Sequence, residues 1–338
     1  MRRPRPSMAD VGRASNVSAQ TVSRYFTGRG YVSAETRARI ASAVAELGYR
    51  PNASARSFRM QRSSIVGVLA LGSLNFGSTD TLTGLGRSAR AGGYTLAIAQ
   101  VEVGYDPSGW EGEARRALEH FVSIPVDGVI VSSPIAGVED VVAEVAGSTP
   151  VVLVSERPRD AAGSVGAHSF LAGVQATRHL IELGHRRIAH VAGPSTRNES
   201  VEREQGYRQA MADAGLEPAV IAGAHDWNAR SGYAAAGEVG DATAVFAAND
   251  EMALGLMSGM AERGMAAPRD VSVVGVDDMP SAAYFSPPLT TVRLDFRALG
   301  ARAFDLLIDR IEGRSASTEQ PLEPTLVVRT STAPPRRD

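Results

Sequence analysis

The chain has 338 residues, which is too long for one ordinary hydrophobic core and predicts two or three domains. It contains no cysteine, so disulfide scaffolds, thiolate metal sites and thiol catalysis are excluded. The formal charge of −2 hides a split, because residues 1–62 carry twelve arginines against three acidic residues, a charge of +9, and the remainder carries −11. A basic N-terminal segment on an acidic body predicts a polyanionic partner for that segment alone.

The N-terminus, Met1-Arg-Arg-Pro-Arg-Pro, is basic, but no apolar run follows it, which argues against a secretory signal. No apolar stretch approaches the roughly 20 residues of a membrane span. We therefore expect a cytoplasmic chain with no membrane partner. The patterns predict four parts: a disordered basic arm over 1–7, a helical domain over 8–50, a linker over 51–62 and a core over 63–338.

The helical domain contains three short helical patterns, over residues 8–15, 19–26 and 33–47. Asn16 tolerates the left-handed conformation that a tight turn needs, and Ser18 is a favourable N-cap for the second helix. Gln20 and Arg24 lie four residues apart and share a face, from which they can reach adenine and guanine edges in a major groove. The pattern predicts a helix-turn-helix. The alternative is a small helical cap with a solvated arginine surface.

Two apolar sets supply this domain with a small core: Val11, Val17 and Val22 between the first two helices, and Ile40, Val44 and Leu47 on the third. Gly48 follows the last of these residues and is a typical helix stop.

From residue 64 onward, short strands rich in Val, Ile and Ala alternate with amphipathic helices. Strands are expected at Ile65–Leu71, Tyr94–Gln100, Gly128–Ser132, Val151–Val154, Arg187–Ala192, Ala244–Ala247 and Val271–Val276. Helices are expected at Phe170–Leu183, Glu202–Ala214, Glu251–Arg263 and Phe296–Glu312. This alternation predicts an α/β core of parallel sheets covered on both faces, as one large sheet or as two lobes. Two lobes place a ligand cleft at the C-terminal ends of the strands.

Polar and aromatic residues stand at several strand–helix junctions of the core. Asn249 follows one predicted strand and Asp277 another, while Arg203, Trp227 and Phe296 lie at other junctions. This set suits a polyhydroxylated ligand, because Arg donates in a fork, Asp accepts from paired hydroxyls and rings pack on a sugar's apolar face. Taken singly, each residue has an alternative role as a helix cap or a satisfied core group.

Patterns that would indicate an enzyme are weak. Gly84-Leu85-Gly86-Arg87-Ser88-Ala89 matches a loose dinucleotide-binding pattern, but it begins more than ten residues after the nearest strand. The six histidines show no metal-ligand spacing, and the sequence has no Gly-x-Ser-x-Gly elbow and no P-loop. We therefore expect no catalysis, no metal and no cofactor.

An ordered series of motifs resembles the head of the LacI/GalR family of transcriptional repressors. The motifs are Asp10-Val11, Val17-Ser18-Ala19-Gln20-Thr21-Val22-Ser23-Arg24, Val32-Ser33-x-Glu35-Thr36-Arg37 and Glu46-Leu47-Gly48-Tyr49-Arg50-Pro51-Asn52. The resemblance implies that the helix opening at Ser18 lies in the major groove. It implies that bases are read by Ala19, Gln20 and Arg24, and that phosphates are contacted by Ser7, Ser18, Thr21, Ser23 and Thr36.

Two residues of this head depart from the family pattern. Gly12 stands where an Ala is usual, which should weaken the first helix by up to roughly 1 kcal/mol. Asn16 stands at the usual turn glycine, a replacement that the turn geometry permits.

The linker has room for two helical turns over residues 52–59, which are marginal alone in water. The resemblance implies that two such hinge helices pair in a dimer and enter the minor groove, where a Leu usually wedges between base pairs. Phe58 stands at that position, and a Phe can also unstack a base step. Asn52, Ala55 and Phe58 are therefore the expected hinge contacts. Without the resemblance, a flexible linker is the alternative.

The core resembles the family's periplasmic-binding-protein-like (type I) core, with two lobes of parallel sheets. Matching motifs occur at 183–189, 248–255, 272–278 and 287–292. We expect lobe 1 over about 63–157 and 293–325, and lobe 2 over about 158–292. The resemblance implies effector contacts from Arg203, Asn249 and Asp277, and effector packing by Trp227 and Phe296.

The segments 226–232 and 294–296 favour the lactose-repressor branch of the family and a β-galactoside or related sugar as the effector. Ser155 stands where that branch has a sugar-binding Asp, and Leu294 replaces a Gln. Arg197-Asn198 instead resembles a pair in the purine-binding branch. Ser155 and Arg197 join the expected effector-binding residues. The effector's identity and the sign of its effect stay open.

The segment 330–338 is broken by proline and has no leucine heptad of the kind that the family's tetrameric members carry. We therefore expect a homodimer on double-stranded, pseudo-palindromic operator DNA. The predicted function is a sequence-specific transcriptional repressor whose operator affinity is controlled by a small sugar-like effector. The alternatives are a transport-type sugar- or purine-binding protein without a DNA role and a Rossmann-type enzyme.

Overall fold

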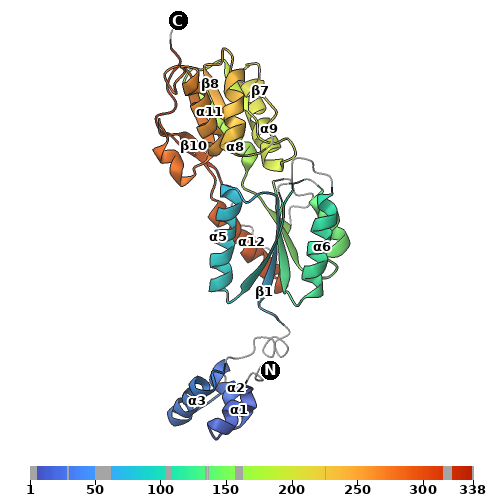
Figure 1. Ribbon diagram of the computed structural model, residues 1–338. Helices are drawn as coiled ribbons and strands as arrows, with labels where there is room; N and C mark the ends of the chain where they lie inside the picture. Colours follow the sequence, from blue (N-terminus) through green and yellow to red (C-terminus); the bar gives the residue numbers. More distant parts are fainter. Residues whose placement is uncertain are drawn as a thin grey trace. The chain divides into compact units, whose positions relative to one another are not determined.

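The computed structural model describes residues 6–28, 30–49, 62–103, 109–133, 135, 137–156, 163–224, 226–314 and 322–336. The chain forms two compact units, residues 1–63 and 64–338, which we call the head and the core (Figure 1). The predicted hinge contacts Asn52, Ala55 and Phe58 lie outside the described residues, as does the arm up to residue 5. No helix in the described ranges is long and apolar enough to cross a membrane.

The described part of the head is helical: α1 (Met8–Ala14), α2 (Ala19–Thr27) and α3 (Ala34–Leu47). Each helix begins after a serine whose hydroxyl oxygen accepts a hydrogen bond from the backbone N–H three residues later, and these caps are Ser7, Ser18 and Ser33. Asn16 adopts the predicted left-handed conformation, with φ of 55°, and Gly48 ends α3 with φ of 58°. The three predicted helices and the turn are confirmed.

The head is held by a small apolar core of Val11, Val22, Val32, Ile40, Ala43 and Tyr49, with Val17 and Val44 partly buried against it. The expectation for Leu47 was wrong, because this side chain is 36% exposed. The buried stripe of α3 passes through Ile40 and Ala43 and is completed by Tyr49 beyond the helix end, so Leu47 falls outside it.

Gly12 has a packing role that helix propensity alone does not predict. A Cβ at this position would lie 2.8 Å from the carbonyl oxygen of Val17 and 3.3 Å from the backbone nitrogen of Ala19. The Gly12 carbonyl accepts a hydrogen bond from the Val17 N–H at 2.9 Å. Glycine therefore lets α1 approach the start of α2 closely, which offsets its propensity cost.

The core contains two sheets. The sheet of lobe 1 has the order β2-β1-β3-β4-β5 and is parallel throughout. Its strands are β1 (Ile65–Leu71), β2 (Thr95–Val101), β3 (Gly128–Ser132), β4 (Val151–Val154) and β5 (Ser164–Val165). Its helices are α5 (Phe76–Ala91), α6 (Trp110–Ser123), α7 (Val138–Val145) and α12 (Phe296–Ile311).

The sheet of lobe 2 has the order β11-β10-β9-β8-β6-β7 and is parallel except for the pair β10–β11. Its strands are β6 (Ile188–Val191), β7 (Ala219–Ile221), β8 (Ala244–Ala247), β9 (Ser272–Asp277), β10 (Thr290–Arg293) and β11 (Thr325–Val327). Its helices are α8 (Ser169–Glu182), α9 (Asn198–Asp213), α10 (Ala229–Ala235) and α11 (Asp250–Glu262).

Helices cover both faces of each sheet, which explains why the strands are almost continuously apolar (Figure 1). In β1, Val66 and Val68 pack in the cluster that contains residues of α5 and α12, whereas Leu69 and Leu71 pack in the cluster that contains residues of α6 and α7. The same division separates the α8–α9 face from the α10–α11 face in lobe 2. The predicted doubly covered parallel sheets are confirmed, in the two-lobed arrangement.

Glycines set the distance between the helices that carry site residues. A Cβ on Gly84 would lie 2.1 Å from the Arg297 carbonyl oxygen, and one on Gly300 would lie 2.1 Å from that of Thr81, so α5 and α12 touch backbone to backbone. α8 and α9 are equally close, since a Cβ on Gly173 would lie 2.2 Å from the Arg203 carbonyl oxygen. Because Gly84 lies inside α5, the dinucleotide-like pattern is helix packing and not a phosphate loop.

The sheets place the lobe boundaries differently from the prediction at two points. β5 pairs with β4, so lobe 1 continues to about residue 165 instead of ending at 157. β10 and β11 belong to the sheet of lobe 2, so residue 293 and the segment 322–336 lie in lobe 2 and only α12 returns to lobe 1. Four of the described strands were not predicted: β5, β7 and β11 are two or three residues long and β10 is four, which is too short for a clear periodic pattern.

Candidate functional site

The predicted base-reading residues lie together on one exposed face of the head. Ala19, Gln20 and Arg24 are all exposed on α2, and Gln20 and Arg24 are one helical turn apart. The buried residue of this helix, Val22, anchors its opposite side to the head core. The arrangement leaves an amide and a guanidinium projecting into solvent from one helix.

Four of the five predicted phosphate-contacting residues lie at helix N-termini, and the fifth, Ser23, lies further along α2. Ser7 forms a reciprocal capping box with Asp10, and the hydroxyl of Ser18 lies 3.0 Å from that of Thr21. Ser7 and Ser18 are exposed, while Thr21, Ser23 and Thr36 are half-buried. These capping hydrogen bonds hold the serine and threonine hydroxyls beside the N-termini of α1, α2 and α3, where backbone N–H groups favour anions.

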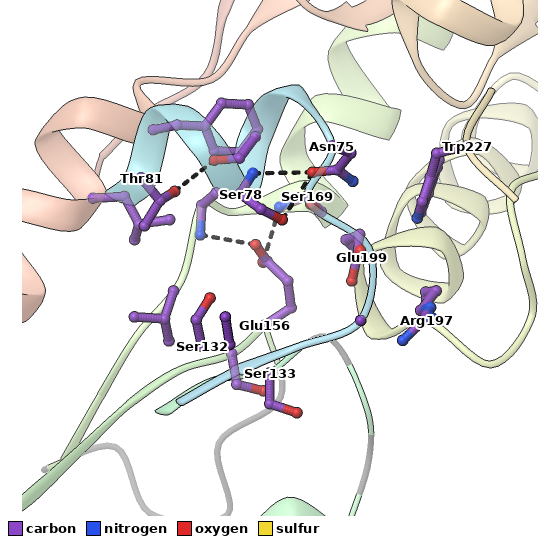
Figure 2. A pocket seen from close by; sticks show the side chains of 18 of the residues that line it. Asn75, Ser78, Thr81, Ser132, Ser133, Glu156, Ser169, Arg197, Glu199 and Trp227 are labelled. Carbon is purple, nitrogen blue, oxygen red and sulfur yellow. Dashed lines mark hydrogen bonds between the residues drawn. The ribbon is translucent and has the colours of Figure 1, made fainter. Parts of the chain in front are cut away.

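The core has a pocket between its lobes, at the C-terminal ends of the strands (Figure 2). All seven effector-binding residues that were predicted from the sequence line it, namely Ser155, Arg197, Arg203, Trp227, Asn249, Asp277 and Phe296. They come from both lobes and from positions up to 141 residues apart, from Ser155 to Phe296. The topology therefore brings the whole set to one place.

Arg203 is the centre of the charged part of the pocket. Its side chain is 4% exposed, and its guanidinium donates to Oδ1 of Asp277 at 3.1 Å and to the Ala248 carbonyl oxygen at 2.6 Å. The guanidinium also lies 5.3 Å from the centre of the Trp227 ring. Its Nε has no hydrogen-bond partner among the described residues. Arg203 thus contacts both the Asp277 carboxylate and the Trp227 ring and holds them in the pocket.

Asp277 ends β9 in a strained backbone conformation, with φ of 114°. Burial raises the pKa of Asp277 to about 6, although the Arg203 guanidinium opposes that rise. Asp277 therefore still has a negative charge at neutral pH, held at the floor of the pocket by one cation.

Asn249 already has partners in this structure. Its amide oxygen accepts from the Met252 N–H at 2.8 Å and caps α11, and its amide nitrogen donates to the Trp227 carbonyl oxygen at 3.0 Å. One N–H of the amide is left for a ligand. Its immediate effect is to fix the loop that carries Trp227.

Arg197 reaches across the cleft from lobe 2 to lobe 1. It precedes α9, and its Nη2 donates to the carbonyl oxygen of Val103, just beyond β2, at 3.0 Å. Its Nη1 is buried without a hydrogen-bond partner among the described residues. Gly72, with φ of 94°, leaves room for it, since a Cβ there would lie 3.1 Å from Nη1.

Lobe 1 contributes an aromatic side chain and hydroxyl groups. The ring of Phe296, at the start of α12, stands edge-on to that of Phe76 at 6.1 Å and covers Gly77. Ser155 is 4% exposed just after β4. Further polar lining comes from Ser73, Asn75, Ser78, Thr81, Ser132 and Ser133.

The sequence analysis missed two carboxylates of the pocket. Glu156 accepts hydrogen bonds from the backbone N–H groups of Ala167 at 2.8 Å and Ser169 at 3.1 Å, where α8 begins (Figure 2). Glu199 lies in the first turn of α9. The signal that points to Glu199 is its distance of four residues from Arg203, which puts both on one helix face. Within the described ranges, no group of three or more His, Asp or Glu side chains is arranged to hold a metal ion.

The fold and the pocket define a class: a small helical head in which α2 exposes Gln20 and Arg24, joined in the chain to a two-lobed core with a polar cleft. Comparisons with known proteins agree with it. A family model for bacterial regulatory proteins of the lacI family matches residues 7–52, and one for a periplasmic binding protein-like domain matches residues 177–332.

Curated relatives match along nearly the whole chain. HTH-type transcriptional repressor PurR of Klebsiella pneumoniae subsp. pneumoniae is 34% identical over 345 residues, with 97% of each chain covered. The ribose operon repressor of Escherichia coli K12 is 32% identical, covering 90% of this chain and 93% of its own.

Solved structures give the same result. The lac repressor dimer bound to operator and the anti-inducer ONPF superposes with a TM-score of 0.88 at 29% identity, covering 98% of this chain and 100% of its own. The complex of the transcriptional regulator CelR with cellobiose has a TM-score of 0.69 at 32% identity, covering 97% and 100%. The chain belongs to the lacI family of bacterial regulatory proteins, transcriptional repressors whose DNA binding is controlled by an effector.

Proposed function

We propose that this chain is a dimeric, cytoplasmic repressor that binds a pseudo-palindromic operator through Ala19, Gln20 and Arg24 and releases or tightens that contact when a small neutral sugar fills the core pocket. It acts by binding and not by catalysis. The observation that carries the proposal is the convergence of seven separately predicted residues on one interlobe pocket, in a chain whose reading helix is exposed on a different unit.

The chemistry of the pocket supports a sugar. Arg203 and Arg197 donate, Asp277 accepts, and Trp227 and Phe296 offer aromatic surfaces, which is the combination that hydroxyl groups and apolar sugar faces require. Two relatives point the same way by their names, the ribose operon repressor and the CelR–cellobiose complex.

A purine is the second candidate effector. The favouring observation is Arg197, whose buried and unpartnered Nη1 lies in the pocket and can donate to a ring nitrogen or carbonyl oxygen. HTH-type transcriptional repressor PurR, at 34% identity, matches 97% of this chain. Purines therefore belong in the same binding screen as the sugars.

Operator binding can be tested with the full chain by selection from a random DNA library, followed by titration of the selected duplex. We expect a two-fold symmetric site, and we expect Arg24→Ala to weaken that site by about 1–3 kcal/mol while leaving non-specific DNA binding nearly unchanged. Arg13→Ala removes the same charge from α1 and should weaken both kinds of DNA equally. Selection of no symmetric site, or equal effects of the two variants on both DNAs, would contradict the proposal.

A further inference from the structure

Five charged side chains line the described part of the pocket, and their charges do not balance. They are the carboxylates Glu156, Glu199 and Asp277 and the guanidinium groups Arg197 and Arg203, which sum to a formal charge of −1. With all five groups ionised, an effector enters a site with one excess negative charge.

Two of the three carboxylates are already satisfied by the protein. Both oxygens of Glu156 accept from backbone N–H groups at the start of α8, and Asp277 is paired with Arg203. Glu199 forms no hydrogen bond or ion pair with another residue in the part of the chain that the structure describes. Its carboxylate is half-buried, and in Figure 2 it lies between Glu156 and Arg197.

Unpartnered donors lie in the same pocket. Arg197 is only 9% exposed, yet its Nη1 has no hydrogen-bond partner among the described residues. Ser169 is 1% exposed, and its hydroxyl has no hydrogen-bond partner among them either. Buried donors without partners are costly, so a site that retains them is organised for a ligand. Arg197 and Glu199 are two residues apart in the chain and offer a donor next to an acceptor.

Resting on the proposed function, we infer that Glu199 is the specificity-determining residue of the pocket. It accepts a hydrogen bond from one hydroxyl of a neutral sugar while Arg197 donates to the neighbouring hydroxyl, and it repels anionic ligands such as sugar phosphates. Adjacent hydroxyls suit this pair because each can donate and accept. A phosphate could use Arg197, but it would meet the Glu199 carboxylate alongside.

The electrostatic environment supports this role. Withdrawal from water raises the pKa of Glu199 to about 7, with Glu156 adding to the rise and with its own backbone N–H, Arg203 and Arg197 opposing it. The two cations do not compensate the lost hydration, which leaves the carboxylate in need of a hydrogen-bond donor.

A first-turn glutamate can also act only on its own helix, through favourable interaction with the N-terminal end of the α9 dipole. That role predicts a small loss of stability when Glu199 is replaced and no change in which ligands bind. Ligand selectivity therefore separates the two roles.

The test uses the full-length chain and isothermal titration with galactose, glucose, ribose and cellobiose, together with glucose 6-phosphate and ribose 5-phosphate. We expect at least one neutral sugar to bind at least 100-fold more tightly than either phosphate. Glu199→Gln should weaken that sugar by about tenfold and should bring the sugar-to-phosphate ratio down by at least tenfold. Glu204→Gln, on the same helix but paired with Arg208 outside the pocket, should change neither value.

The inference is overturned by a wild-type chain that binds a sugar phosphate better than its neutral counterpart, by one that binds none of the neutral sugars, or by Glu199→Gln with unchanged selectivity. Operator binding of the same variants without sugar keeps the two proposals apart. Glu204→Gln should bind the selected operator like the wild type, and a chain that binds no operator either with or without the sugar refutes the proposed function even where sugar selectivity is as expected.

Discussion

The two lobes of the core contribute opposite kinds of surface to one pocket. Lobe 2 supplies both guanidinium groups, two of the three carboxylates and the indole ring, from Arg197, Arg203, Glu199, Asp277 and Trp227. Lobe 1 supplies the carboxylate of Glu156 and otherwise small hydroxyl-bearing and apolar residues around the ring of Phe296. The lobe 2 groups are already ordered by one another, through the Arg203–Asp277 pair and the Arg203–Trp227 contact.

This difference indicates a division of labour. Lobe 2 holds a preorganised recognition surface that loses little entropy when a ligand binds. Lobe 1 supplies a wall that depends on the packing of α5 against α12, and its first residues follow the linker from the head directly in the chain, at residue 64. Changes in lobe 2 should therefore act through charge, and changes in lobe 1 through packing.

The largest expected effect is in lobe 2. Arg203→Met leaves the buried Asp277 carboxylate without its cation and the Ala248 carbonyl without a donor, so we expect the unfolding free energy of the ligand-free chain to fall by about 3–5 kcal/mol. Urea unfolding, followed by circular dichroism, measures it.

The matched control lies in lobe 1. Arg297 also pairs with an aspartate, Asp80, at 2.8 Å, but its side chain is 53% exposed. Arg297→Met should therefore cost less than about 1 kcal/mol. Equal losses in the two variants would show that the pair in lobe 2 is not the buried, organising contact described above.

The next largest expected effect concerns the packing of α5 against α12 in lobe 1. Gly84→Ala places a Cβ against the Arg297 carbonyl, so we expect it to destabilise lobe 1 by about 1–3 kcal/mol. Gly86→Ala, two residues along the same helix, meets only the flexible Arg90 side chain at 3.6 Å and should stabilise by up to about 1 kcal/mol. Thermal and urea unfolding of both variants should show opposite signs, and the same sign in both would refute close α5–α12 packing.

The smallest expected effect is a pH dependence of Asp277. Its folded-state pKa of about 6 lies above the usual value near 3.9, so the folded chain binds more protons and this contribution to stability is lost as the pH rises through 6. Asp277→Asn does not titrate. We therefore expect the stability of the wild type relative to Asp277→Asn to fall by roughly 1 kcal/mol between pH 5 and pH 7.

Taking the difference between the two proteins removes the groups that they share, including Glu199 and the buried His190, whose pKa is lowered to about 3. If the stability of the wild type relative to Asp277→Asn rises between pH 5 and pH 7, Arg203 lowers the pKa of Asp277 by more than burial raises it.

Most of the fold could be predicted because its signals are local. The serine cap at Ser18, the turn at Asn16 and the strand–helix alternation each depend on a few neighbouring residues, and the structure confirms them. The short strands β5, β7 and β11 could not be predicted, since two or three residues pair only where the sheet already exists. The packing role of Gly12 could not be predicted either, because helix propensity takes no account of how closely α1 approaches α2.

The pocket divides in the same way. Asn249 lies two residues beyond β8 and Asp277 ends β9, and the ends of parallel strands meet at one edge, so their convergence could be anticipated. Glu156 and Glu199 could not, because a glutamate after a short strand or in a first helical turn is common and its role depends on which neighbours leave it unpaired. The hydroxyl-rich wall of lobe 1 has no sequence signature, since serine and threonine are frequent in loops.

The most direct test of the account is reciprocal coupling between the pocket and the head. The affinity of the full chain for its selected operator is measured with and without the tightest-binding neutral sugar, and the affinity for that sugar is measured with and without operator. The account predicts that both affinities change by one common factor, within the roughly 5–150-fold range of typical couplings. A sugar that fills the pocket while that factor stays at one would contradict it.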